Sequence, residues 1–250
     1  MARNPLGIDL QLLTFNAKQQ KTFEETGVVV LGLELASGSL IEEGFKPFIL
    51  CGTATLLDLV CQQPGNCVRY GGNGRFNSVD QCRINRTRHL RDDRKGFQAL
   101  LHAEIEFCVA IAKLKGFDIA FRLNTLSDLN WNRTYRRFPD VRFFDYTKEI
   151  PRYRAFLNPK SSHPKNVHFC YSMHEQSNLT QVKAFLRRGG NVSFLYHGTI
   201  PETFHGFPVS DGDKHDLRYI DTPGHFIALS AKAGMRKKSN RGSPFLQVVN

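Results

Sequence analysis

Apolar and polar positions alternate along the chain in patterns that change from strand-like to helix-like and back. Residues 28–35 (VVVLGLEL) are apolar and largely β-branched, and Ser-Gly-Ser follows closely, so they predict a buried strand. Residues 96–115 have apolar side chains near every fourth position and are followed by Gly116, which predicts a helix that ends at a glycine. Residues 54–60 fit either a short strand or a helical turn, and the polar, glycine-rich residues 62–74 predict a loop.

After Gly116, short apolar runs of the strand type recur at intervals along the chain. A helical pattern at 178–190 separates two of them and closes with glycines. Strands that alternate with helices or irregular crossovers are typical of a parallel sheet. With the strand at 28–35 we count six or seven strands, which favours a TIM-barrel-like α/β fold, complete or distorted; closure stays open at this level. The further predicted strands are 118–124, 141–147, 167–172, 191–197 and 225–231.

The length and cysteine usage bound the class of protein. The chain has 250 residues, of which 41% are hydrophobic, enough for one large α/β domain. We expect this domain to span 1–233, with a basic insertion at 62–95 and a basic tail at 234–250. No apolar run reaches membrane-spanning length, and the N-terminus resembles no signal peptide. Six scattered cysteines favour reduced thiols, so we expect a cytoplasmic protein without a membrane partner.

The charge balance points to an acidic partner. Lys and Arg number 34 against 23 Asp and Glu, a net charge of +11, and nucleic acid is the commonest partner of such chains. Residues 78–94 carry charges at helical spacing. We expect phosphate contacts from this region and the tail, although a solvated helix face paired with Asp80, Asp92 and Asp93 is the alternative. The expected contacts are Arg75, Asn77, Arg83, Arg86, Arg88, Arg91, Lys237 and Lys238.

Polar side chains collect where the predicted strands end. In parallel α/β folds, ligands bind at the carboxyl ends of the strands. Four successive strand ends therefore deliver candidate substrate-binding side chains to one rim, and the alternative for any one of them is a loop residue or helix cap. The candidates are Asn124 and Ser127, then Tyr146 and Lys148, then Ser172, His174 and Glu175, and finally His197.

Two carboxylates of this rim suit catalysis. Asp145 leaves its predicted strand directly, and a carboxylate at a strand tip can act as nucleophile or general base. Lys148 would hold it ionised or bind a phosphate. Asp128 lies in the loop after the preceding strand, so both can face one pocket. We favour Asp145 as the nucleophile because of its position on the rigid strand.

Two further clusters could bind a ligand or a metal. The segment 208–221 contains Asp211, Asp213, Asp216 and Asp221, which suit a hard cation or a polar ligand, or else a turn-rich loop capped by its own side chains. A zinc or iron–sulfur site would use Cys61 and Cys67, but their spacing matches no standard motif, so we expect no cofactor. The sequence motifs of P-loop NTPases, α/β-hydrolases and zincins do not occur.

Several motifs together resemble a family of phage proteins, the gene product 88-like family. They occur in order over about 60–230: GRFNSV (74–79), RINRTR (83–88), RLNTLSDLNW (122–131), FPDVRFFDYTK (138–148) and PVSDGDKHDLRYID (208–221). We associate this family with phage DNA-modification proteins distantly similar to tRNA-guanine transglycosylases. Those are barrel enzymes that exchange guanine for a 7-deazaguanine, with one Asp as nucleophile on the sugar C1′ and another directed to the base. The family commonly shows three cysteines before the first motif, whereas this chain keeps Cys61 and Cys67 without a third in the loop that follows.

The resemblance implies a transglycosylase that inserts a 7-deazaguanine base into DNA, or alternatively tRNA, in an infected host cell. Asp128 and Asp145 would then share the two catalytic roles, with Asn124 and the 211–216 aspartates at the base edge or in the loop over it. The aromatic residues Phe76, Trp131 and Tyr146 could stack on an extruded base. Two other functions stay open: a non-catalytic nucleic-acid-binding phage protein, and a metal-dependent nuclease or radical enzyme.

Overall fold

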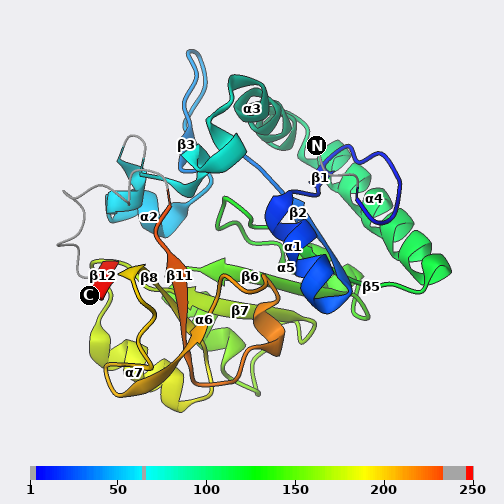
Figure 1. Ribbon diagram of the computed structural model, residues 1–250. Coiled ribbons are helices and arrows are strands. Elements are labelled where there is room, and N and C mark those ends of the chain that lie inside the picture. The colour runs from blue at the N-terminus through cyan, green and yellow to red at the C-terminus, as the bar shows by residue number, and fades with distance from the viewer. Residues whose placement is uncertain (1–3, 64–65, 233–245, 250) are drawn as a thin grey trace.

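A largely parallel sheet of ten strands forms the centre of the molecule (Figure 1). The computed structural model describes residues 4–63, 66–232 and 246–249. The strands follow the order β1-β2-β5-β6-β7-β8-β11-β10-β9, and β12 also pairs with β8. Their bounds are β1 Leu13–Thr14, β2 Val28–Leu33, β5 Asp118–Arg122, β6 Arg142–Thr147, β7 Val167–Ser172, β8 Val192–Gly198, β9 Thr203–Phe204, β10 Phe207–Asp211, β11 Phe226–Ser230 and β12 Leu246–Val249, with a separate hairpin of β3 Ser39–Leu40 and β4 Phe48–Ile49.

The pairing is parallel from β2 to β10, which confirms the predicted mainly parallel α/β class. Phe121 pairs with Phe143, and Asp145 pairs with Phe169, so three consecutive strands run side by side in register. Only the two outermost pairs of this path, β1 with β2 and β9 with β10, are antiparallel. As a result, the carboxyl ends of the parallel strands lie along one edge of the sheet, which we call the carboxyl edge.

Where helical spacing extends over many residues of the sequence, the structure has a helix. The predicted helix at 96–115 is α4, which ends at Gly116 in the left-handed conformation with φ 71°. The charged stretch at 78–94 is α3, and the ambiguous stretch at 54–60 begins inside the short helix α2. The bounds are α1 Ala17–Thr26, α2 Gly52–Leu56, α3 Asn77–Asp92, α4 Arg94–Lys115, α5 Asn132–Arg137, α6 Ile150–Phe156 and α7 Leu179–Arg187, with 3-10 turns η1 Val60–Gln62, η2 Val68–Tyr70, η3 Gly72–Arg75 and η4 Arg218–Ile220.

Side chains that alternate along the strands give the sheet two different faces. One face packs against helices in the main core, where the Tyr135 ring of α5 lies 5.0 Å from that of Phe143 and the rings of Tyr153 and Phe185 lie 4.9 Å apart. We call this the outer face. The inner face is a smaller cluster in which Val30, Ala120 and Phe144 meet Leu217.

Helix α1 and the loop 212–221 cover the inner face. A Cβ atom on Gly32 of β2 would lie 2.5 Å from Nε2 of Gln19, so the side-chain amide of Gln19 on α1 lies directly against the strand at this position. Leu217, in the loop before η4, packs into the inner cluster from the other side. The inner face is therefore filled by chain segments rather than by facing strands.

The α/β class with mostly parallel strands is thus confirmed, whereas the closure that the sequence left open is not present in the described residues, where the sheet is open and no TIM barrel is shown. In the described part of the chain, the sheet path ends at β1 and β9, and β2 does not pair with β10. A TIM barrel needs its first and last strands hydrogen-bonded to each other around a core of inward side chains. Within the same residues no helix combines the length and apolar character that crossing a membrane requires.

Candidate active site at the carboxyl edge

Asp145 lies on β6 near the carboxyl edge and has no solvent exposure. Its Oδ1 accepts a hydrogen bond from the backbone N–H of Asn124 (2.9 Å), and its Oδ2 accepts one from the hydroxyl of Tyr135 (3.1 Å). Burial raises the pKa of Asp145 to about 7, although Nε of Arg122, 3.8 Å from Oδ1, acts in the opposite direction. Asp145 therefore ties the end of β5 and helix α5 to β6 from inside the core.

Asn124 organises the loop that follows β5. Its Oδ1 accepts hydrogen bonds from the hydroxyl of Ser127 (2.9 Å), the N–H of Leu129 (2.8 Å) and the indole N–H of Trp131 (3.1 Å). Its side-chain amide donates to the carbonyl of Leu129 at 3.0 Å. Asn124 and Ser127 are buried, and Asn124 uses most of its hydrogen-bonding capacity inside its own loop.

Asp128 connects the same loop to the end of β6. Its Oδ2 accepts from the N–H of Lys148 (2.9 Å) and the hydroxyl of Thr147 (3.2 Å), and its Oδ1 pairs with the guanidinium of Arg152. Nζ of Lys148 donates to the hydroxyl of Ser172 at the end of β7, at 2.7 Å. Asp128, Lys148 and Ser172, which we call the edge group, thus join the ends of β5, β6 and β7 in one chain of contacts.

Residues 50–60 lie across this edge, and Figure 1 shows α2 beyond the ends of the strands. The backbone N–H of Asp128 donates to the carbonyl of Leu50 (2.7 Å), and the thiol of Cys51 donates to the carbonyl of Leu126 (3.4 Å). A carboxylate oxygen of Glu175 accepts from the N–H of Val60. Glu175, a predicted substrate-binding residue, therefore holds the covering segment 50–60 in place.

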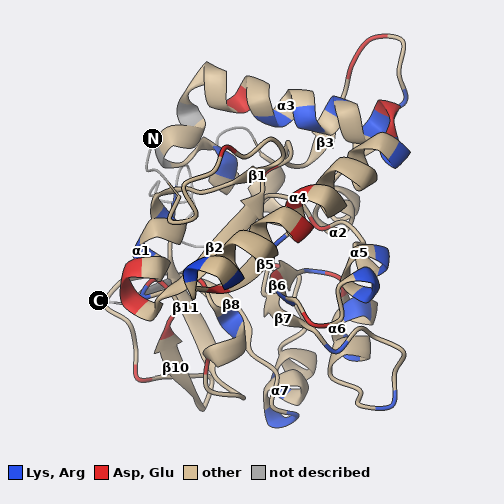
Figure 2. Ribbon diagram, turned by 90° about the vertical axis from the view of Figure 1, so that its right-hand side faces the viewer, with Lys and Arg blue, Asp and Glu red and all other residues tan. Residues whose placement is uncertain are grey.

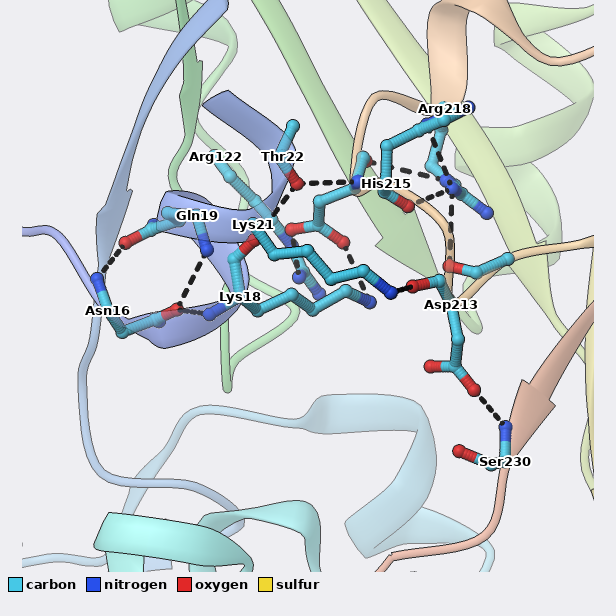
Figure 3. Close-up of polar contacts among 12 residues, drawn as sticks. Asn16, Lys18, Gln19, Lys21, Thr22, Arg122, Asp213, His215, Arg218 and Ser230 are labelled. Carbon is cyan, nitrogen blue, oxygen red and sulfur yellow. Dashed lines mark hydrogen bonds and ion pairs between the residues drawn. The ribbon is translucent and has the colours of Figure 1, made fainter. Parts of the chain in front are cut away.

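A buried ionic cluster lies on the inner face of the sheet (Figure 3). Nη1 of Arg122 on β5 lies 2.9 Å from Oδ2 of Asp216, and Nζ of Lys18 on α1 lies 3.1 Å from Oδ1. Thr22, also on α1, accepts a hydrogen bond from the N–H of Asp216 at 2.9 Å. Although burial alone would raise it, the neighbouring cations Arg122 and Lys18 hold the pKa of Asp216 well below its usual range.

Tyr146 and Arg218 belong to the same cluster. We call it the inner-face cluster. The guanidinium of Arg218 is fully buried, with Nε 3.2 Å from a carboxylate oxygen of Asp221. The guanidinium of Arg122 lies 4.9 Å from the centre of the Tyr146 ring. Burial raises the pKa of Tyr146 above its usual value, and within the described residues its hydroxyl has no hydrogen-bond partner.

The aspartates at and just after the end of β10, Asp211 and Asp213, form a turn against the neighbouring strand β11. Oδ2 of Asp213 accepts from the N–H of Ser230 (2.8 Å), and Oδ1 of Asp211 accepts from the N–H of Asp213 (2.9 Å). Nζ of Lys21 donates to the backbone carbonyl of Asp213 at 2.9 Å (Figure 3). The structure thus separates these two residues from Asp216, which joins the inner-face cluster. His197, near the end of β8, is half-buried.

The described residues contain no group of three or more His, Cys, Asp or Glu side chains placed to hold a metal ion. The thiol of Cys67 contacts the hydroxyl of Ser37 at 3.1 Å, and Cys61 lies in η1 with its sulfur 3.8 Å from Nε2 of Gln62. All six cysteines are free thiols. The sulfurs of the two candidate metal ligands, Cys61 and Cys67, therefore contact a glutamine amide and a serine hydroxyl, respectively.

Figure 2 shows the basic positions along helix α3, and several of its arginines are paired with carboxylates. Arg83 is buried, with Nη2 2.7 Å from Glu34, and Arg88 and Arg91 both pair with Glu42. Arg86 makes only a long contact from Nε to the carbonyl of Gln11 (3.4 Å), and Asn77 is exposed. The side chain of Arg75, together with Lys237 and Lys238, lies outside the described part of the chain.

Sequence reasoning missed the cations of the buried clusters. Arg122 lies within an otherwise apolar strand segment (DIAFRLN), and Arg218 lies between apolar residues in LRYID. A charged side chain in such a position is rarely buried without a partner, so it signals a buried ion pair. The arginine Arg152, in the first half of α6, carried no comparable signal.

Comparison with known proteins assigns the family. No curated protein and no solved structure is significantly similar to this chain. A family model described as gene product 88 matches residues 11–243, which include all described elements of the sheet except β12. Since this match covers most of the 250 residues, the chain belongs to the gene product 88 family.

Proposed function

We propose that this protein exchanges a guanine base for a 7-deazaguanine base in nucleic acid, at the carboxyl edge of its parallel sheet. The main observation in support is the edge group, in which Asp128, Lys148 and Ser172 meet from the ends of three consecutive parallel strands. Open parallel sheets bind their ligands at this edge. The Asp128 carboxylate accepts from the backbone N–H of Lys148, and the ammonium of the same lysine donates to the Ser172 hydroxyl, so a carboxylate, an ammonium group and a hydroxyl are available there for a reaction at a sugar carbon.

The proposed reaction has two displacements at C1′ of the sugar. In the first, a carboxylate oxygen of Asp128 forms a bond to C1′ while the bond to the guanine nitrogen breaks, and the departing base takes a proton from the ammonium of Lys148. In the second, the incoming 7-deazaguanine gives its N–H proton back to Lys148 and bonds to C1′, which releases the carboxylate of Asp128. A carboxylate is suited to both steps because it can trap the oxocarbenium-like centre.

The geometry favours Asp128 over Asp145 as the nucleophile. The side chain of Asp128 is 11% exposed, and its Oδ1 pairs with the guanidinium of Arg152. Asp145 has no solvent exposure, and Tyr135 of α5 encloses it. We therefore assign Asp145 to positioning the loop that carries Asp128.

The test is incubation of the protein with duplex DNA, and separately with tRNA, in the presence of isotope-labelled 7-deazaguanine precursors, followed by nucleoside mass spectrometry. We expect label in the nucleic acid with the wild-type protein, and none with Asp128→Asn. Asp140→Asn, which changes an exposed carboxylate, serves as the matched control and should retain activity. Label incorporation by Asp128→Asn, or none by the wild type with any precursor, would contradict the proposal.

A nucleic-acid-binding protein without catalysis is the second candidate function. It is favoured by the hydrogen bonding of Asn124 and Asp128, whose side chains each accept from three donor groups of the surrounding loops. Such saturation is typical of side chains that shape a loop. Binding of DNA without incorporation of label in the same assay would support this candidate.

A further inference from the structure

A hollow of about 560 Å³ opens between α6 and α7, the two short helices that pack on the outer face of the sheet. This volume lies within the range of small-ligand sites in proteins. Its wall contains two arginines, several neutral polar side chains and no carboxylate. The lining residues are Arg154, Asn178, Thr180, Gln181, Ala184, Phe185 and Arg188.

Its two arginines are exposed and available. Within the described residues, neither Arg154 nor Arg188 forms an ion pair with a carboxylate. Nη2 of Arg188 donates to the carbonyl of Leu157 at 3.2 Å, which fixes the guanidinium and leaves its other N–H groups open. This differs from α3, where Arg83, Arg88 and Arg91 all pair with carboxylates.

The sequence of α7 strengthens the positive charge of this region. The stretch 179–190 (LTQVKAFLRRGG) contains Lys183, Arg187 and Arg188 and no acidic residue. Figure 2 shows the basic end of α7 at the surface. Asn178 caps the N-terminus of the helix, because its Oδ1 accepts from the N–H of Gln181 at 3.1 Å, and Arg188 is the C-cap; both ends of α7 therefore border the hollow, and its positive charge comes from the arginines.

We propose that this hollow binds the phosphate backbone of nucleic acid, with Arg154 and Arg188 as the phosphate contacts. Guanidinium groups match phosphate oxygens in planar, two-pronged hydrogen bonds, and the neutral amides and hydroxyl of Asn178, Thr180 and Gln181 add donors without repelling an anion. The net charge of +11 suits the same partner. The inference rests on the proposed function for the nature of the partner, but the binding requires no base exchange.

The test measures the anisotropy of a fluorescein-labelled oligonucleotide, single-stranded and duplex, as the full-length protein is added at several salt concentrations. We expect the double variant Arg154→Gln/Arg188→Gln to bind at least tenfold more weakly at low salt. The slope of log affinity against log salt should decrease by about two for the duplex, since each lost phosphate contact removes about 0.9. The double variant should melt at the same temperature as the wild type.

Arg133→Gln/Arg136→Gln on α5 is the matched control. Both arginines are exposed, and Arg136 donates to the carbonyl of Ser162 at 3.1 Å, much as Arg188 does to Leu157. The control should keep wild-type affinity and slope; an equal loss in the control, or an unchanged slope in the test variant, overturns the inference. Binding to vesicles of anionic lipid but not to the oligonucleotide also overturns it.

These outcomes separate the inference from the proposed function. If Arg154→Gln/Arg188→Gln loses binding while neither the wild type nor any variant incorporates 7-deazaguanine, the phosphate-binding site is supported and base exchange is contradicted. If the wild type exchanges bases and the slope of log affinity against log salt is unchanged in the variant, the proposed phosphate-binding site is contradicted and base exchange is supported.

Discussion

The hydroxyl of Tyr135 and the carboxylate of Asp145 meet at 3.1 Å in a place with almost no solvent exposure. Tyr135 comes from α5 and Asp145 from β6, so their contact fixes the helix against the strand beside the edge group. Burial raises the pKa of both groups, that of Asp145 to about 7. The folded protein therefore keeps this carboxyl protonated at pH values where the unfolded chain has already ionised it.

This pKa predicts a distinctive dependence of stability on pH. Between about pH 4 and 7 the folded state binds more protons at Asp145 than the unfolded state, so this group's contribution to stability falls as pH rises. Asp145→Asn removes the ionisation. We expect the free energy of unfolding of the variant, relative to wild type, to increase by roughly 1 kcal/mol per pH unit across that window. Urea unfolding at pH 4.5, 6 and 7.5 measures it, with Asp140→Asn as control; a pH-independent difference would contradict this prediction.

Asp216 should be the most sensitive carboxylate of the inner-face cluster. Asp216→Asn leaves the guanidinium of Arg122 without its main carboxylate partner in a buried site, and breaking such a pair costs about 3–5 kcal/mol. Lys18→Met should cost much less, because the Lys18 side chain is 38% exposed and can be solvated. The measurement is the free energy of unfolding of both variants. A smaller loss for Asp216→Asn than for Lys18→Met would be inconsistent with the cluster.

The same cluster should also respond to acid. The pKa of Asp216 lies below its unfolded value, so the stability that this group contributes is present above about pH 4 and is lost as pH falls below it. In Asp216→Asn, the part of acid destabilisation that begins below about pH 4 should shrink. Thermal melting of the variant and wild type at pH 3 and pH 5 tests this. A loss of melting temperature on acidification as large as in wild type would assign the effect to other groups.

Trp131 is the single tryptophan of the chain and reports on the loop that Asn124 organises. Asn124→Ala removes the acceptor of three hydrogen bonds and leaves buried donors unpaired, which should cost about 2–4 kcal/mol and shift Trp131 emission to the red. Ser127→Ala removes one donor and should cost about 1 kcal/mol with little spectral change. Equal spectra for wild type and Asn124→Ala would show that the loop keeps its shape without this side chain.

The arginines of α3 should separate into structural and solvent-facing residues. Arg83→Met leaves Glu34 buried without its cation and should lower the free energy of unfolding by about 3 kcal/mol with unchanged DNA affinity. The sequence-based prediction of phosphate contacts from Arg86 and Arg88 implies that Arg86→Glu and Arg88→Glu weaken DNA binding, and we expect the larger effect at Arg86 because Arg88 is already paired with Glu42. Salt-dependent binding and urea unfolding of the three variants test this. Unaltered DNA binding by Arg86→Glu would make α3 a solvated face only.

The spacing of apolar residues along the chain was enough to predict the helices and strands in which that spacing repeats regularly. The strand at 28–35, the helix at 96–115 with its terminal Gly116, and the alternating strands from 118 to 231 follow from apolar spacing, because spacing decides which face a side chain presents. The sequence also indicated that polar groups would gather at the carboxyl edge. It did not predict α1, which begins with a capping box of Asn16 and Gln19 but is only weakly apolar. It also did not predict β10, which is five residues long.

What only the tertiary structure decided is which charged side chains are buried and with what partner. Arg83 meets Glu34 across 49 positions of the chain, and Arg122 meets Asp216 across 94, so no local pattern could pair them. The same holds for Asp128 and Asp145, which look equivalent at two strand ends but differ in exposure because α5 encloses one of them. Closure of the sheet was likewise undetermined, because α1 and the loop 212–221, distant in sequence, occupy its inner face. Burial and pairing depend on which distant segments pack together, whereas strand and helix periodicity depend on neighbours along the chain.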